Sequence, residues 1–337
     1  TRGGFPHPLR TATMSTPAAP PRRKDLLDIE SLTREEIVFL LDTARPFKDL
    51  FDRSVKKVPA LRGKTVLNLF FEPSTRTRAS FEIAAKRLSA DVTNLAITQS
   101  SVTKGESVLD TVDTMQSMKV DYMVVRHAAA GVPAFIARHT PAAVINAGDG
   151  NHAHPTQALL DAFTMREALG ELTGRRILLV GDLLHSRVFR SVSTVARKLD
   201  MEVGIFAPTT LIPSGRPDYM QAFHTFKEAL EWSPDFVYLL RLQRERQAAH
   251  FFPSLREYHH IFGLTRERFL ECRRRGIRIM HPGPVNRGVE LVDEVLTYEH
   301  CLINRQVENG IAARMAVLYW LQPAVTPLPD EKEEAAS

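Results

Sequence analysis

The sequence predicts an α/β protein of two domains, each a mainly parallel β-sheet flanked by helices. Short apolar runs with the length and composition of buried strands alternate along the chain with stretches of helical spacing. This alternation is typical of parallel sheets that are covered on both faces. The 337 residues suffice for two domains of roughly 150 residues each. We expect the two sheets to divide near residue 155.

The two ends of the chain lack this pattern. Residues 1–25 are rich in Pro, Ala, Thr and Arg, so we expect a disordered leader in which Met14 is a candidate natural start. Residues 323–337 are acidic toward their end and are expected to be a disordered tail. After the leader, Thr33 and Glu36 form a capping-box pattern that opens a helix through about Lys48.

The apolar runs give the expected strands of the two sheets. They are Thr65–Phe71, Val92–Ile97, Tyr122–Val125, Ala143–Ala147, Arg176–Val180, Glu202–Phe206, Phe236–Leu240 and Ile277–Met280. Helical patterns lie between most of them, including Ala79–Leu88. A last helix with an apolar stripe is expected from about Asn304 to Leu321.

The composition of the chain limits the classes of function that it can have. No apolar run reaches about 18 residues, so no membrane partner is indicated. Cys272 and Cys301 form no metal or disulfide pattern, and we expect a cytoplasmic protein with no metal and no cofactor. The net charge of +5 permits a nucleic-acid partner without requiring one. We assign Arg273–Arg275 to a helix end and expect no nucleic-acid contact there.

The most informative stretch follows the strand expected at Thr65–Phe71. Within five residues it holds three hydroxyls and two guanidiniums, those of Ser74, Thr75, Arg76, Thr77 and Arg78. At the start of a helix, N–H groups without intrahelical partners and the helix dipole favour an anion. An ordinary cap would need one oxygen and no cation. We therefore predict a cradle for a phosphate group.

Further polar residues follow the other expected strands, where ligands bind in parallel α/β sheets. The side chains concerned include Ser100, Lys104, Arg126, His154, Gln157, Arg187, Arg241, Gln243 and His281. Taken alone, Arg126 and Arg187 would more often be surface ion-pair residues, and His154 a helix N-terminal residue with no task. We leave His127, His152 and His185 without a function.

Together these residues resemble the transcarbamoylase family, over about residues 26–322. The segments Ser74–Arg78 and His154–Gln157 are similar to those shared by the whole family. Three features resemble its aspartate branch, namely Lys104, the Arg241-Leu242-Gln243 segment, and His281–Pro284 where the ornithine branch has His-Cys-Leu-Pro.

The resemblance implies that the carbamoyl group of carbamoyl phosphate is transferred to the α-amine of L-aspartate, an early step of pyrimidine synthesis. It implies that Ser74, Thr75, Arg76 and Thr77 hold the phosphate. Thr77, Arg126 and His154 would point at the carbonyl oxygen, where positioned donors stabilise the developing oxyanion. Gln157 would orient the carbamoyl amide. His154 would donate a hydrogen bond, as either imidazole or imidazolium, and the leaving phosphate is a plausible acceptor for the amine proton.

For aspartate, the resemblance implies that Arg187 and Arg241 bind the two carboxylates and Gln243 adds an amide contact. Bidentate pairing favours arginine for this task. The backbone of Gly283 and Pro284, joined by a cis peptide, would lie against the substrate.

The resemblance also implies a homotrimer with shared active sites, in which the neighbouring subunit donates Ser100 and Lys104. Glu72 and Glu106 are candidates for interface or loop-ordering contacts. A carbamoyl-phosphate domain would comprise residues 26–154 and 305–322, and an aspartate domain residues 155–304. A regulatory or dihydroorotase-like partner stays possible.

Two alternatives stay open at this stage. One is a transcarbamoylase for another amino acceptor, which substitution of ornithine for aspartate in the assay would reveal. The other is a structural homologue without activity inside a pyrimidine-pathway complex. Such a subunit would be expected to have lost Arg76, His154 or Lys104, yet all three are present.

Overall fold

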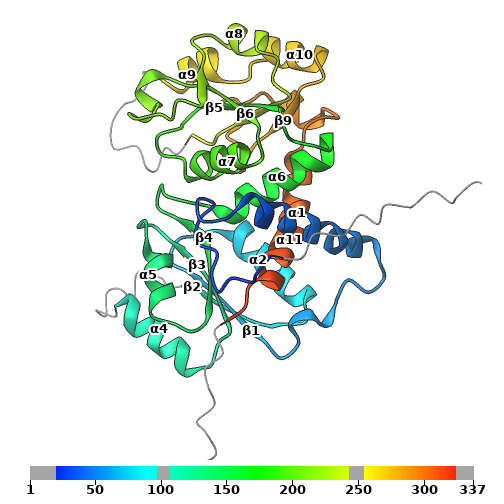
Figure 1. Cartoon of the computed structure of the whole chain (residues 1–337). Coiled ribbons are helices and arrows are strands. Elements are labelled where there is room, and N and C mark those ends of the chain that lie inside the picture. Colours follow the sequence, from blue (N-terminus) through cyan, green and yellow to red (C-terminus); the bar gives the residue numbers. More distant parts are fainter. Residues whose placement is uncertain (1–19, 97–106, 243–253, 324–337) are drawn as a thin grey trace, which may run out of the picture.

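The computed structural model describes residues 20–96, 107–242 and 254–323, and it contains two parallel sheets flanked by helices (Figure 1). The first sheet has the order β2-β1-β3-β4. Its strands are β1 (Thr65–Phe70), β2 (Asp91–Ala96), β3 (Tyr122–His127) and β4 (Ala143–Asp149). Every printed pairing between these strands is parallel. The expected α/β class is confirmed.

The second sheet has the order β7-β6-β5-β8-β9 and is also parallel. Its strands are β5 (Arg176–Val180), β6 (Glu202–Phe206), β7 (Met220–Ala222), β8 (Phe236–Leu239) and β9 (Arg278–Met280). The expected strands lie at or within two residues of these bounds. The edge strand β7 was not predicted, because its three residues are too few to show a period.

Helices precede, connect and follow the strands. They are α1 (Arg34–Asp49), α2 (Thr75–Arg87), α4 (Val108–Ser117), α5 (Val132–Arg138), α6 (Pro155–Leu169), α7 (Arg187–Lys198), α8 (Phe226–Glu231), α9 (Leu255–Phe262), α10 (Arg266–Arg274) and α11 (Ile303–Trp320). The capping box expected at α1 is present, since the Thr33 hydroxyl accepts from the N–H of Glu36 and the Glu36 carboxylate from that of Thr33. Helix α10 ends before Gly276, which has a φ of +67°. No helix in the described ranges has the length and apolarity that a membrane crossing requires.

Helix α2 begins earlier than its apolar spacing indicates. Helical spacing is visible in the sequence over Ala79–Leu88, whereas the helix begins at Thr75 with Ser74 as the N-cap residue. Thr75, Arg76 and Thr77 therefore form its first turn, at the strand-to-helix junction where the phosphate cradle was predicted. Hydroxyl and β-branched residues favour helix interiors weakly, which is why the apolar spacing alone placed the start too late.

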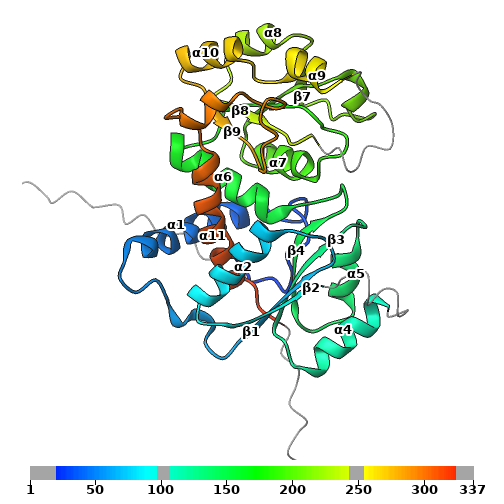
Figure 2. The ribbon, with the colours of Figure 1, turned by 180° about the vertical axis from the view of Figure 1, so that it is seen from behind.

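Helix α11 returns from the second sheet to the first. It packs against α1, α2 and α6 and also contacts β9 of the second sheet. Figure 2 shows α11 beside α2 and α6, with the second sheet beyond them. Trp320 and Val317 near its end are buried. This return brings residues from the end of the chain to those near its start.

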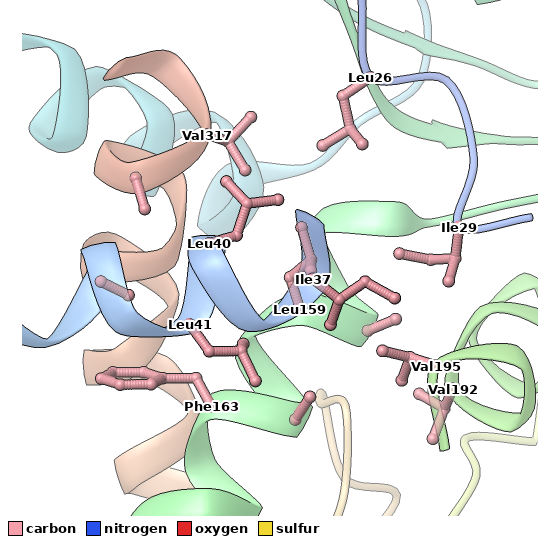
Figure 3. Close-up of a cluster of buried hydrophobic side chains, with 14 of the residues drawn as sticks. Leu26, Ile29, Ile37, Leu40, Leu41, Leu159, Phe163, Val192, Val195 and Val317 are labelled. Carbon is pink, nitrogen blue, oxygen red and sulfur yellow. The ribbon is translucent and has the colours of Figure 1, made fainter. Parts of the chain in front are cut away.

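A continuous apolar cluster joins the two halves of the molecule. It contains Val66 of β1 and Ile205 of β6, and therefore residues of both sheets. Figure 3 shows its middle part, where Ile37 of α1 and Leu159 of α6 lie near Val192 of α7. All of these side chains are almost fully buried. The junction between the two sheet units is thus a hydrophobic core.

The chain already has defined contacts before residue 26, where the folded region was expected to begin. Arg23 forms an ion pair with Glu36 at 2.6 Å, and Asp25 accepts a hydrogen bond from the Val144 N–H at 2.8 Å. Residues 1–19 and 324–337, which hold most of the expected leader and tail, lie outside the described residues. Cys272 and Cys301 are not joined in a disulfide.

Candidate active site

A cavity of about 800 Å³ lies where the two sheet units face each other. It collects residues from the segment after β1, from β3, from the starts of α2, α6 and α7, from the segments after β8 and β9, and from α11. The predicted site residues among them are Ser74, Thr75, Arg76, Thr77, Arg126, His154, Gln157, Arg187, Arg241, Gly283 and Pro284. The structure therefore brings these predicted site residues together, and Glu72 and His281, which the sequence also singled out, line the same cavity.

The first turn of α2 forms one wall of this cavity. Ser74 occupies the N-cap position, yet its hydroxyl makes no capping hydrogen bond. N–H groups in the first turn of a helix have no intrahelical acceptor, and the dipole places about half a positive charge there. The hydroxyl of Ser74 thus remains for another partner, and the interpretation of this segment as an ordinary cap is wrong. Arg78 is not among the cavity-lining residues.

Arg76 reaches from α2 to the turn that follows β9. Gly283 has a φ of +63°, and a Cβ on it would lie 2.6 Å from Nη1 of Arg76. Glycine therefore permits both the backbone conformation and the close approach of the guanidinium. The peptide bond from Gly283 to Pro284 is cis, as the resemblance implied. Burial, and then the charge of Arg241, lower the pKa of Arg76.

Arg126 and Arg187 face one carboxylate. Oε2 of Glu72 lies 3.2 Å from Nε of Arg126 and 3.2 Å from Nη2 of Arg187. The Arg187 guanidinium also donates to the carbonyl of Gly150 at 3.2 Å. A Cβ at Gly148 would lie 2.9 Å from this guanidinium, so glycine makes room for it. Neither arginine is a surface ion-pair residue, since the side chains are 15% and 5% exposed.

His154 is the N-cap residue of α6 and is buried. Its backbone N–H donates to the Ser191 hydroxyl of α7 at 2.9 Å, while its Nδ1 has no hydrogen-bond partner among the described residues. Burial, followed by the charges of Arg187, Arg126 and Arg314, lowers the pKa of His154 well below its ordinary value. The structure thus favours neutral imidazole at neutral pH, which still has one N–H to donate.

Gln157 lies one turn further along α6, and its amide donates to the Asp161 carboxylate at 3.1 Å. Asp161 also accepts from the amide of Gln306 at 2.7 Å and from the hydroxyl of Tyr238 at 2.7 Å. The other end of the Gln306 amide accepts from the N–H of His281 at 3.0 Å. A buried hydrogen-bond network therefore connects α6, α11, β8 and the turn after β9.

Arg314 on α11 is a cavity residue that sequence reasoning missed. It is 4% exposed, donates to the carbonyl of Gly310 at 2.8 Å and lies over the ring of Phe81. Burial lowers its pKa to about 10, so it stays charged at neutral pH. The helix that carries it is recognisable only by its apolar stripe, which gave no sign of a site, because only the return of α11 brings Arg314 to the cavity.

Two acidic residues beside the cavity were not predicted to act there. Glu72 is a candidate for interface or loop-ordering contacts, and within the chain it pairs with two arginines of the cavity. Glu290, not singled out at all, is buried and accepts from the N–H of Leu242, the residue after Arg241. Proximity in sequence to the Ser74–Arg78 segment was the one available signal for Glu72.

The charge of the cavity lining favours anions. Arginines outnumber carboxylates five to one among the lining residues, with Arg76, Arg126, Arg187, Arg241 and Arg314 against Glu72. Guanidiniums pair with phosphate and carboxylate groups in bidentate fashion. The arrangement can therefore hold a ligand with several anionic groups beside a helix N-terminus. Ser100, Lys104, Glu106 and Gln243 lie outside the described residues.

Comparison with known proteins agrees with this geometry. The family model described as "Aspartate/ornithine carbamoyltransferase, carbamoyl-P binding domain" matches residues 24–167. A second model, "Aspartate/ornithine carbamoyltransferase, Asp/Orn binding domain", matches residues 173–321. The chain belongs to the aspartate/ornithine carbamoyltransferase family.

Relatives within this carbamoyltransferase family are similar over nearly their whole length. The aspartate carbamoyltransferase catalytic subunit of Akkermansia muciniphila is 61% identical over 301 residues, which are 89% of this chain and 97% of the relative. That of Gemmatimonas aurantiaca is 48% identical over 320 residues, covering 95% of this chain and all of the relative.

Solved structures of the same family have a similar fold. Aspartate transcarbamoylase from Trypanosoma cruzi in complex with carbamoyl phosphate is 28% identical with a TM-score of 0.80, over 90% of this chain and 99% of the other. The same enzyme in complex with N-(phosphonacetyl)-L-aspartic acid is 29% identical with a TM-score of 0.79, over 91% and 98%. The catalytic subunit from M. jannaschii is 32% identical with a TM-score of 0.76, over 88% and 97%.

Proposed function

We propose that this cavity transfers the carbamoyl group of carbamoyl phosphate to the α-amine of L-aspartate, giving carbamoyl aspartate and phosphate. The reaction is that of aspartate carbamoyltransferase, a step of pyrimidine biosynthesis, and the identity of 48–61% to catalytic subunits of that name supports it. The observation that carries the proposal at the level of residues is the meeting of the α2 N-terminus with Arg126 and His154 in one cavity.

The phosphate of the substrate is held at the start of α2. Ser74, Thr75, Arg76 and Thr77 supply hydroxyls and a guanidinium there, and the first-turn N–H groups add their dipole. The uncapped hydroxyl of Ser74 supports this assignment. A dianionic leaving group bound in this way is stabilised as negative charge moves onto it.

The carbonyl oxygen of the substrate is bound by Thr77, Arg126 and His154, which donate to the oxyanion that develops there. Preorganised donors of this kind can each lower the barrier by about 3 kcal/mol. His154 acts as a neutral donor, because burial and three arginines disfavour its protonation. Gln157 contacts the carbamoyl amide, and Gly283 and Pro284 lie against the substrate through their backbone.

Aspartate is bound by the arginines on the other side of the cavity. Arg187 and Arg241 pair with its two carboxylates, and Gln243 adds a contact. Glu72 holds Arg187 until the substrate carboxylate arrives. The amine loses its proton to the leaving phosphate, so positioning and electrostatics account for most of the rate.

We further propose a homotrimer in which Ser100 and Lys104 come from the neighbouring subunit. In this arrangement residues 26–154 and 305–322 form the carbamoyl-phosphate domain, and residues 155–304 the aspartate domain. The return of α11 to the first sheet supports this division. A regulatory or dihydroorotase-like chain is a further possible partner.

The test is carbamoyl-aspartate formation by the purified chain, together with its mass in solution. Activity in a trimer is expected. A folded trimer without activity on either aspartate or ornithine would contradict the proposed reaction, and activity with ornithine alone would replace aspartate as the acceptor.

A further inference from the structure

Asp161 is a carboxylate with no exposed surface, one turn beyond Gln157 on α6. Its Oδ1 accepts from the amide nitrogens of Gln157 at 3.1 Å and Gln306 at 2.7 Å, and its Oδ2 accepts from the hydroxyl of Tyr238 at 2.7 Å. The family resemblance and the proposed reaction give this residue no task. A buried carboxylate is costly unless its oxygens are satisfied, and here three donors converge on it.

The carboxylate determines which way the Gln157 amide faces. An ionised carboxylate only accepts hydrogen bonds, whereas a Gln side chain has a donor NH₂ and an acceptor carbonyl on opposite sides. Turning the Gln157 amide over would place two acceptors against each other. The NH₂ of Gln157 therefore faces Asp161, which leaves the Gln157 carbonyl for the cavity that this residue lines.

We propose that Asp161 is a positioning residue that makes Gln157 an acceptor, so that the site selects an acyl phosphate with an NH₂ group on its carbonyl carbon. The proposal rests on the contact between Gln157 and the carbamoyl amide in the proposed function. An acyl phosphate with a methyl group in place of NH₂ offers no donor, and it leaves the Gln157 carbonyl without a partner. Asp161 itself touches no substrate in this arrangement.

The same carboxylate fixes a second amide. Its contact with Gln306 turns the Gln306 carbonyl toward the N–H of His281, in the turn that leads to Gly283 and Pro284. The groups that face Asp161 are Gln157 on its own helix, Gln306 and the Arg314 charge from α11, and Tyr238 from β8. Burial, opposed by these donors, raises the pKa of Asp161 to about 7.

Two stable probes separate this role from a purely structural one. Phosphonoacetamide and acetonylphosphonate share the phosphonate, the methylene and the carbonyl, and they differ only in NH₂ against CH₃. Calorimetry on the full chain gives a dissociation constant for each, and their ratio measures the preference for NH₂. Asp161→Leu keeps the approximate shape of the side chain but has no acceptor for the NH₂ of Gln157, so we expect the ratio to fall by about 10- to 100-fold.

Thr164→Val is the matched control. It removes buried hydrogen bonds on the same helix, to the Asn309 amide and the Leu160 carbonyl, without changing a partner of Asp161. It should cost stability as any lost buried hydrogen bond does, and leave the ratio within about threefold. Loss of affinity for both probes in equal measure in Asp161→Leu would assign Asp161 a structural role and overturn the inference.

Gln157→Leu separates this inference from the proposed function. If Gln157→Leu abolishes the preference for NH₂ and Asp161→Leu keeps it, Asp161 has no positioning role and the Gln157 contact stands. If Gln157→Leu keeps the preference, the assigned contact of Gln157 fails and the inference fails with it. Turnover of the unaltered chain with carbamoyl phosphate tests the reaction independently of both results.

The unaltered chain gives a second test if Asp161→Leu does not fold. A neutral carboxyl accepts the hydrogen bond from the Gln157 NH₂ more weakly than a carboxylate does, so the preference for NH₂ should fall as the pH is lowered from 8 to 5. Titrations of the phosphonate and of nearby histidines affect both probes and largely cancel in the ratio. A ratio that stays constant over this range would overturn the inference.

Discussion

The carboxylate of Glu72 lies 3.2 Å from the guanidinium of Arg187, and this ion pair joins the segment after β1 to the first residue of α7. The side chains are 18% and 5% exposed, so solvent screens the pair less than a surface pair. Because Glu72 also lies 3.2 Å from Nε of Arg126, one carboxylate orients an arginine on each side of the cavity.

Replacement of Glu72 should therefore weaken both halves of the site. For Glu72→Gln we expect kcat/KM for aspartate to fall about tenfold or more, because Arg187 loses the charge that orients it. Steady-state kinetics with each substrate varied would measure this. Glu82→Gln, which alters an exposed pair with Lys86 on α2, is the control and should leave both constants unchanged. Equal kinetics for the two variants would refute the role of Glu72.

The phosphate cradle predicts a large effect of Arg76→Ala on turnover with little effect on stability. Loss of this guanidinium should lower kcat by roughly 10²- to 10³-fold, because charge on the departing phosphate is no longer stabilised. The cavity walls partly desolvate the Arg76 guanidinium, but the residue is exposed to solvent in the open cleft, so the free energy of unfolding should change by less than about 0.5 kcal/mol. Lys86→Ala removes a cation from the same helix outside the cavity and serves as the control. Near-normal turnover of folded Arg76→Ala would remove Arg76 from the mechanism.

Arg241 should act on aspartate more than on carbamoyl phosphate. Arg241→Ala is expected to raise the KM for aspartate about 10- to 100-fold. This factor corresponds to the binding free energy of a charge-assisted bidentate contact. Calorimetry should find the affinity for carbamoyl phosphate within about threefold of normal. Arg266→Ala, an exposed arginine paired with Glu294, is the control on the same side of the molecule. A parallel loss of affinity for both substrates would show that the two subsites are not separable at Arg241.

The lowered pKa of His154 predicts a pH dependence of stability. Below about pH 6.5 the unfolded chain gains a proton at this residue while the folded chain does not, so its contribution to stability is present above pH 6.5 and is lost on acidification. In His154→Gln the free energy of unfolding should decrease less steeply as the pH falls below 6.5. The slopes of the two proteins should differ by up to about 1.4 kcal/mol per pH unit. Urea unfolding of both proteins between pH 5.5 and 7.5 measures the difference. The lowered pKa of His281 acts in the same direction in both proteins and cancels. Parallel curves would show that His154 binds protons equally in the folded and unfolded chains, which contradicts a lowered pKa.

Much of the fold could be predicted because strands and helices leave periodic patterns. The run Arg176–Val180 was placed at its observed bounds, since five apolar-rich residues between turns read clearly as a buried strand. The strand Met220–Ala222 could not be found, because Pro213, Gly215 and Pro217 precede it and three residues carry no pattern.

Residues close together in the sequence revealed the site, and residues joined only by the fold did not. The segment Ser74–Thr77 is informative because several hydroxyls and a guanidinium gathered at one helix start favour a phosphate, although the neighbouring Arg78 does not line the cavity. Arg314 and Asp161 lie on helices that read as core, and their roles depend on how α11 and α6 cross. Neither crossing leaves a trace in the local sequence, so these two residues required the structure.

The apolar cluster that runs from Val66 of β1 to Ile205 of β6 limits how the chain can be divided. Apolar area shared between two units stabilises both only while they remain together, at about 25 cal/mol per Å². A chain cut between α6 and β5 would leave each fragment with an exposed apolar face. The two fragments should therefore precipitate when they are expressed separately. Both sheets should unfold in a single cooperative transition when denaturant is added. Any motion that opens or narrows the cleft must then pivot around this shared core without splitting it.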